Sequence, residues 1–333
     1  MDFTTTHEQD LLRDTARQLL ANECPPALLR AHLDDRAASA GLWTHLRDFT
    51  GLATGPATDL ALVLFETGYV AAPGPFFPTV ALFGSLLAAC GHPLLADVVE
   101  AGASGTVAIA DATGRIEPHD APVKSFVVDA DIVEHVAVVD PGPTVRVIAR
   151  ADLDVRVVPT VDASRRVAEV TVPDRDGLSS PLAPRDLDGW RDRATVALAA
   201  EMVGTARRIF DMALAYAKDR HQFGVPIGSF QAIQHKLAEM ALVLERATAA
   251  VQYAAMTVDA DDPDRRRAAH VAKAAAGAAA RRMVKDGAQI HGGIGYTWEH
   301  DLHLFLRRAT ADEYLFGTTG WHHDRLAEIL FAS

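Results

Sequence analysis

The chain has 333 residues, of which 49% are hydrophobic and 23% charged, and its formal net charge is −12 at pH 7. This acidic balance argues against a nucleic-acid-binding surface, and no uncharged apolar run reaches the ~18 residues needed to cross a membrane. Two cysteines, Cys24 and Cys90, are too few for a disulfide framework or a cysteine-based zinc site, and no metal site is predicted. The charged opening segment does not resemble a signal peptide, so we expect a cytoplasmic protein without a nucleic-acid or membrane partner.

Residues 1–104 are predicted to form an N-terminal helical domain. Apolar side chains recur with helical spacing in the runs DLALVLFETGYVAA and TVALFGSLLAACG. Between these runs stand Pro73, Pro75 and Pro78, and a proline restricts both itself and the residue before it. A loop is therefore expected to separate two helices at this point.

Residues 105–185 are predicted to form a middle β domain. The pattern changes to short β-branched runs such as TVAIA, EHVAVVD, TVRVIAR and RVAEVTV, separated by Asp, Gly and Pro. The runs follow one another at roughly ten-residue spacing without helical stretches between them. This spacing indicates a mainly antiparallel sheet or a small barrel.

Residues 186–333 return to the helical period, in four segments of which three are long. The segments begin at GWRDRATVALAAEM, SFQAIQHKLAEM, PDRRRAAHVAKAAAG and WHHDRLAEILFA. Their many alanines permit close helix packing and have high helix propensity. The prediction is a C-terminal four-helix bundle, and the whole chain is expected to have an α+β fold that is mainly α.

Two motifs in this last region carry possible chemistry. In RHQFG, Gly224 can adopt the left-handed conformation that ends a helix, and Pro226 prevents the helix from continuing. Arg220 near that helix end would interact favourably with the helix dipole. The second motif, AQIHGGIGYT, follows a helix rather than a strand, so it is not a nicotinamide-dinucleotide fingerprint. Each motif alone could be only a helix stop.

Together, the segments YAKDRHQFGVPIGSFQAIQHKLAEM and QIHGGIGYTWEHDLHLFLRRA resemble signatures of the acyl-CoA dehydrogenase family. Members of this family are flavoenzymes that oxidise the Cα–Cβ bond of acyl-CoA thioesters. The resemblance covers most of the chain, in the same order of helices, strands and helices. It implies FAD as the cofactor, an acyl-CoA as the substrate, and a dimer of dimers that associates through the bundles.

The resemblance also implies which residues contact FAD. They are Arg220, Gln222, Phe223, Gln289, Gly292, Gly293 and Thr318. In the family, the arginine and the aromatic residue lie against the adenosine diphosphate half of an FAD whose flavin ring sits in the neighbouring subunit. A guanidinium suits a pyrophosphate because it presents a rigid fork of donors. Thr318 matches a threonine near the flavin of the chain's own subunit.

The family's catalytic base is missing from both of its usual positions. YLFGTTG places Phe316 where most members hold a glutamate, and the alternative position in the first bundle helix falls on Ala194. Three acids are candidate replacements. Glu201 lies two turns from Ala194 but ~10 Å along the helix, and Asp192 points about 200° away from Ala194. Glu313 precedes Phe316 by three residues and could simply end a helix in solvent.

The chain's own flavin pocket also departs from the family pattern. A loop resembling T-E-P-x-x-G-S-D is absent from VAIADATGRIEPHDAPVKSFVV, and Gly320 stands where a glutamine is usual. The residues that serve the neighbour's cofactor are present. This asymmetry resembles the shorter subunit of heteromeric acyl-CoA dehydrogenases from actinobacterial steroid degradation, in which a longer homologous partner completes the flavin site in an α2β2 complex.

The expected function is therefore FAD-dependent dehydrogenation of a bulky or steroid-derived acyl-CoA, as the shorter subunit of such a complex. Three alternatives stay open. One is a self-sufficient homo-oligomer with a relocated base. Another is a non-catalytic scaffold subunit that orders the partner's FAD. The third is a flavin monooxygenase or oxidase on the same fold.

Overall fold

The computed structural model describes residues 3–142, 144–173 and 178–331, so the outermost positions of the predicted N- and C-terminal domains lie outside the described residues. Helices form the region before the strands: α1 (His7–Glu23), α2 (Pro26–Asp34), α3 (Ala40–Leu46), α4 (Ala57–Tyr69) and α5 (Ser85–Cys90), with 3-10 helices at Arg36–Ser39 and Arg47–Ala53 and π-helices at Phe77–Gly84 and Asp97–Ala101. The expected break after α4 is present, because a loop connects Tyr69 to the π-helix at Phe77.

The described strands of the middle region form two sheets. Their bounds are β1 (Gly105–Ala108), β2 (Val123–Val128), β3 (His135–Asp140), β4 (Thr144–Ala149), β5 (Asp154–Val158), β6 (Val167–Thr171) and β7 (Leu178–Pro181). One sheet has the order β1-β3-β4-β7 and the other the order β2-β6-β5. Every pair in these sheets is antiparallel except β1 with β3, so the mainly antiparallel prediction is confirmed. The strand β7 was not predicted, because its sequence LSSP lacks a β-branched run.

The last region contains α6 (Pro184–Asp219), α7 (Gln231–Asp259), α8 (Arg265–His291), α9 (Leu302–Tyr314) and α10 (Thr319–Phe331). Four of them correspond to the predicted segments. The helix α9 was missed, and the reason is physical: Arg308 and Asp312 occupy its buried face, so the apolar periodicity that marks a packed helix is interrupted.

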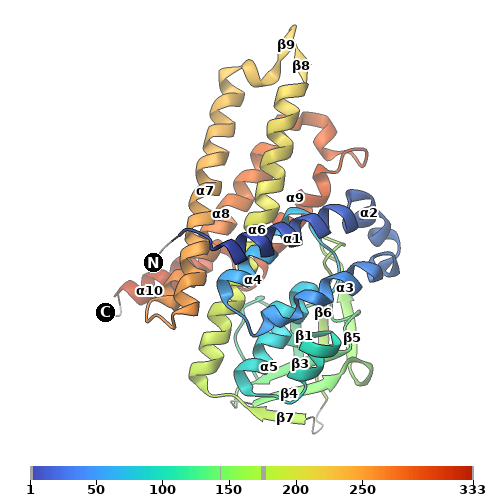
Figure 1. Ribbon diagram of the computed structural model, residues 1–333, viewed down its shortest axis with the longest axis vertical. Helices are drawn as coiled ribbons and strands as arrows, with labels where there is room; N and C mark the ends of the chain where they lie inside the picture. The colour runs from blue at the N-terminus through green and yellow to red at the C-terminus, as the bar shows by residue number, and fades with distance from the viewer. Residues whose placement is uncertain (1–2, 143, 174–177, 332–333) are drawn as a thin grey trace.

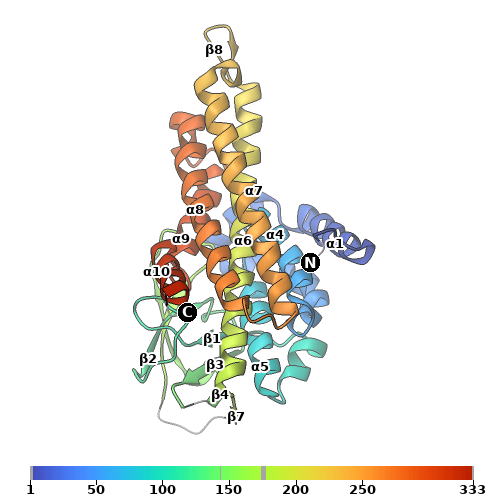
Figure 2. The same cartoon turned by 90° about the vertical axis from the view of Figure 1, so that its left-hand side faces the viewer.

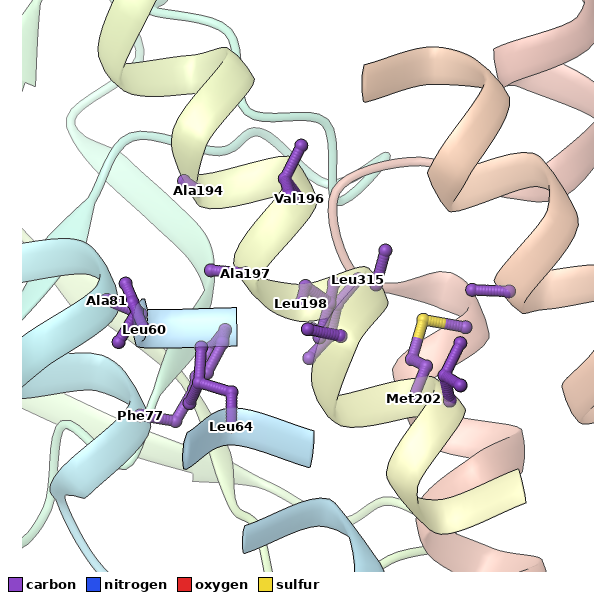
Figure 3. Close-up of a cluster of buried hydrophobic side chains, with 14 of the residues drawn as sticks. Leu60, Leu64, Phe77, Ala81, Ala194, Val196, Ala197, Leu198, Met202 and Leu315 are labelled. Carbon is purple, nitrogen blue, oxygen red and sulfur yellow. The ribbon is translucent and has the colours of Figure 1, made fainter. Parts of the chain in front are cut away.

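The long helix α6 lies against α4 with very little space between the two backbones. A Cβ atom added to Gly204 would lie 2.0 Å from the carbonyl oxygen of Phe65, and one added to Gly68 would lie 2.0 Å from that of Glu201. Glycine is therefore required at the crossing. Figure 3 shows the apolar core on either side of α6, with Ala194 and Ala197 on the side of Phe77.

The elements are arranged along α6, which runs most of the length of the molecule (Figures 1 and 2). The two sheets gather around one end of α6. At its other end, α6 leads into the short hairpin of β8 (His221–Gln222) and β9 (Val225–Pro226), which projects beyond the remaining helices. Among the described residues, no helix is both long and apolar enough to cross a membrane.

Candidate functional site

A two-residue turn joins β8 to β9 and carries the first of the predicted cofactor contacts. Phe223 and Gly224 form the turn, with φ angles of 55° and 83°. Positive φ at both central residues is the type I′ geometry, which favours Asn-Gly and strains a phenylalanine. At the base of the hairpin, the backbone N–H of Ile227 donates to the carbonyl of Arg220 at 2.7 Å. A strained residue in a well-defined turn indicates that its side chain is kept for something other than stability.

The side chains around this turn face outward. The Phe223 ring is 93% exposed and contacts the edge of Phe230, with ring centroids 6.1 Å apart. Arg220 and Gln222 are exposed as well. Within the part of the chain that the structure describes, the Arg220 guanidinium forms no ion pair. The hairpin therefore exposes a large aromatic ring and a cation that has no ion pair among the described residues.

The end of α8 lies at the same end of the bundle. The rings of Tyr216 on α6 and His291 on α8 stack with centroids 4.5 Å apart, which fixes the two helix ends against each other. Beside them Gln289, Gly292 and Gly293 are exposed. A Cβ atom added to either glycine would meet nothing within 4 Å, so the backbone is open to an approaching molecule. The structure thus brings six of the seven predicted FAD contacts to one end.

Thr318 lies apart from the other six. Its hydroxyl accepts a hydrogen bond from the backbone N–H of Trp321 at 3.3 Å and so caps α10. The neighbouring carbonyl of Gly317 accepts from Lys273 on α8 at 3.1 Å. Lys273 precedes Gln289 by sixteen residues, which corresponds to about 24 Å along α8. Thr318 therefore belongs to a different part of the surface.

The two usual base positions lie inside the molecule. Ala194 is fully buried in the core. Phe316 is 6% exposed, has a φ of 61°, and stacks on Phe77 with ring centroids 6.5 Å apart. Neither side chain can accept a proton, so a base at this place would have to come from another residue.

The first candidate acid, Glu201, is bound to an arginine. Its Oε1 accepts from Arg165 at 2.7 Å, and the same guanidinium donates to Asp312 at 3.0 Å. The Arg165 guanidinium also lies 4.7 Å from the centroid of the Phe77 ring. Burial alone would lower the pKa of Arg165, but Glu201 and Asp312 raise it above its ordinary value, while burial raises the pKa of Asp312 to about 6. Glu201 is the counter-ion of a permanently charged group.

The other two candidate acids are paired too. Asp192 accepts from Arg265 of α8 at 3.1 Å, and burial raises its pKa to about 6. The alternative that Glu313 ends a helix in solvent is wrong, because Glu313 is 6% exposed. Its Oε1 accepts from the backbone N–H of Thr319 at 3.1 Å and from Arg281. Each carboxylate therefore has a structural partner in this chain.

Sequence comparison identifies the family. Residues 192–331 match the family described as acyl-CoA dehydrogenase, C-terminal domain. The acyl-CoA dehydrogenase IpdE2 of Mycobacterium tuberculosis is 32% identical over 321 residues, which cover 92% of this chain and 92% of that protein. The chain belongs to the acyl-CoA dehydrogenase family. The members of this family are oxidoreductases. A second relative, IpdE2 of Mycolicibacterium smegmatis, is also 32% identical to this chain, over 94% of this chain and 95% of that protein.

Solved structures show the acyl-CoA dehydrogenase fold over nearly the whole chain. A variant of the Tcur3481-Tcur3483 steroid ACAD superposes with a TM-score of 0.87 and 25% identity, covering 98% of each chain. The ChsE4-ChsE5 complex of Mycobacterium tuberculosis superposes with a TM-score of 0.86 and 22% identity, covering 100% of each chain. The predicted fold class is confirmed.

The chemistry of the hairpin end can be compared with that of the predicted cofactor. At the hairpin end, an unpaired guanidinium, an exposed ring and open glycine backbone suit the nucleotide part of a dinucleotide. The junction between the β1–β2 connection and the bundle holds a cavity of about 40 Å³, lined among others by Glu117, Asp192, His270 and Trp321. Drug-sized ligands need roughly 300 Å³ or more. A cavity of this size does not hold a flavin ring, and Thr318 is not among its lining residues.

Sequence reasoning missed Arg165 and Asp312. Arg165 stands in DASRRVAEV, where charged residues next to a strand are typical of an exposed loop. It meets Glu201 and Asp312 across 36 and 147 positions of sequence. Asp312 lies on the helix that was not predicted. No local pattern could have shown that these three charges meet inside the protein.

Proposed function

We propose that this chain is a subunit of a heteromeric FAD-dependent acyl-CoA dehydrogenase and that its hairpin end binds the adenosine diphosphate half of an FAD shared with a longer homologous chain. The observation that carries the proposal is made at Arg220 and Phe223. Arg220 is a cation without an ion pair within the described chain, and Phe223 is an exposed ring on a strained backbone, and both belong to the hairpin at the end of the bundle.

The residues of the hairpin end have distinct tasks in this proposal. Arg220 offers parallel N–H donors to a pyrophosphate, a geometry that a lysine cannot reproduce. Phe223 offers a rigid face for stacking or apolar contact, at low cost in side-chain entropy. Backbone N–H groups near Gly292 and Gly293 are open to further contacts, because no Cβ atom stands in front of them. Together these groups hold and orient the nucleotide.

The chemistry then belongs mainly to the partner. FAD, when bound, accepts the hydride that leaves Cβ of the acyl-CoA. The proton on Cα needs a carboxylate within hydrogen-bond reach. In this chain Glu201 is held by Arg165, Asp192 by Arg265, and Glu313 is bound to Arg281 and a helix N-terminus. The proposal therefore assigns the base to the longer chain.

The proposed substrate class is a bulky acyl-CoA such as a steroid-derived thioester. Its support is the likeness to the Tcur3481-Tcur3483 steroid ACAD, at 25% identity over 98% of each chain. Turnover of steroid side-chain thioesters against butyryl-CoA tests this part separately. Preference for butyryl-CoA would contradict it and leave the cofactor assignment intact.

The central test is flavin retention by the complex, isolated from native cells through a tag on this chain. We expect a longer homologous chain to copurify, with fewer flavins than polypeptides. Arg220→Ala should lose most of the bound flavin without changing the unfolding free energy of the flavin-free protein by more than about 0.5 kcal/mol, because an exposed arginine without an ion pair contributes little stability.

The matched control is Arg156→Ala, which removes an exposed arginine among the strands, far from the hairpin. It should keep the flavin. If Arg220→Ala keeps a full complement of flavin, the proposed contact does not exist. If this chain purifies alone with one flavin per polypeptide that is reduced by an acyl-CoA, the protein is a self-sufficient homo-oligomer.

A further inference from the structure

The interior of the chain contains a loop that carries charged side chains inward. The connection between β5 and β6 turns into the protein, where Asp162 and Ser164 bind Arg308 of α9 at 2.6 and 2.8 Å. On its other side, the backbone N–H of Arg166 donates to Asp129 at 3.1 Å, and Asp129 is paired with Arg36. Anchors to two separate helical elements fix the loop.

This loop places Arg165 at the meeting point of all three regions. The guanidinium has Glu201 of α6 on one side, Asp312 of α9 on another, and the Phe77 ring over its face. Each of the four residues is less than 5% exposed. The Phe77 ring in turn stacks on Phe316. The cation and the two rings fill a layer between the helical region, the strands and the bundle.

Several interactions hold this layer in place. Phe316 is kept in its left-handed conformation by its neighbours: Lys273 donates to the carbonyls of Glu313 and Gly317, and His322 Nε2 lies 3.2 Å from the Phe316 carbonyl oxygen. Arg165 keeps its proton in a protein and therefore stays charged. Moving its side chain out of the interior would leave two buried carboxylates, those of Glu201 and Asp312, without their cation. The arrangement in which Arg165 fills the space between Glu201, Asp312 and Phe77 is therefore the stable one.

We infer that Arg165 closes the interior of this subunit, so that no thioester can reach the position of Phe316 in this chain. The inference rests on the proposed function in one respect, that Phe316 stands where relatives of this chain carry their base. It adds a second reason for assigning the base to the longer chain: the space at Phe316 is filled by a salt-bridged arginine and two aromatic rings, and the carboxylate is absent.

The test is the reactivity of a cysteine placed at the closed position in the isolated complex. Phe316→Cys should react with a thiol reagent at least about 100-fold more slowly than Val161→Cys, which lies on the same loop as Arg165 but is 50% exposed. Modified positions are identified by mass spectrometry, which separates them from Cys24 and Cys90. In the double variant Phe316→Cys/Arg165→Ala, the thiol should react at least about tenfold faster than in Phe316→Cys alone.

Three outcomes would overturn the inference. Phe316→Cys could react as fast as Val161→Cys, the double variant could stay as slow as the single variant, or a non-reactive CoA thioether could protect the thiol. Ala194→Cys, a smaller change at a fully buried position, serves as the reporter if Phe316→Cys does not fold. The flavin test with Arg220→Ala does not depend on these rates, so a failed closure and a failed cofactor contact are distinguishable.

Discussion

Phe223 and Phe316 both have a positive φ angle but lie in opposite environments. Phe223 has a φ of 55° and is 93% exposed, whereas Phe316 has a φ of 61° and is 6% exposed. Burial compensates the backbone strain at Phe316, because the ring packs against Phe77. Among the described residues, Phe223 has a ring contact with Phe230 but no comparable burial. This difference between an exposed and a packed phenylalanine supports the proposal that the hairpin end is completed by another chain.

The largest expected effect concerns the interior. Arg165→Ala should lower the unfolding free energy by about 3–5 kcal/mol, because it leaves Glu201 and Asp312 without their buried cation. Denaturant unfolding measures the change. The control Arg156→Ala breaks an exposed ion pair with Glu169 and should cost at most about 1 kcal/mol. Equal losses for the two variants would mean that the interior is open to water.

The second prediction tests whether burial holds Phe316 in place. Phe316→Asn gives the left-handed position a residue that tolerates it, but removes a buried ring and buries an amide. We expect a net loss of about 3 kcal/mol in unfolding free energy, since large-to-small core substitutions cost about this much. Stability equal to that of the wild type would show that the ring contributes no packing energy.

The third prediction is a pH dependence that originates in the interior. Burial raises the pKa of Asp192 to about 6 from 3.8, so between these values the folded protein keeps a proton that the unfolded chain has lost. The contribution of Asp192 to unfolding free energy therefore falls, by about 2 kcal/mol, as pH rises from about 4 to about 6. Asp192→Asn should remove this part of the slope, whereas Asp154→Asn, at an exposed position, should not. Identical slopes for wild type and Asp192→Asn would contradict the assignment.

The smallest expected effect concerns the hairpin. Phe223→Asn creates the Asn-Gly pair that a type I′ turn favours and should raise the unfolding free energy by about 1 kcal/mol. The same variant should retain less flavin in the complex. If Phe223→Asn is more stable and retains as much flavin as the wild type, the proposed contact between Phe223 and the cofactor is contradicted.

The sequence allowed the order of elements to be predicted because hydrophobic periodicity is a local property. The period near 3.6 at both ends of the chain and the β-branched runs between them correspond to helices and strands of the structure. Periodicity failed at α9, where Arg308 and Asp312 take core positions, and at the short strand β7. Both failures occur where tertiary contacts, rather than local preference, determine the conformation.

The sequence by itself determined the family, the missing carboxylates at Ala194 and Phe316, and the motif around Arg220, because these depend on residue identity at fixed spacing. Only the tertiary structure decided how the candidate acids are used. Glu201 and Asp312 meet Arg165 from distant parts of the chain, and a buried charge is tolerated only where an opposite charge meets it. Such a meeting depends on the packing of three regions at once, which no short segment of sequence contains.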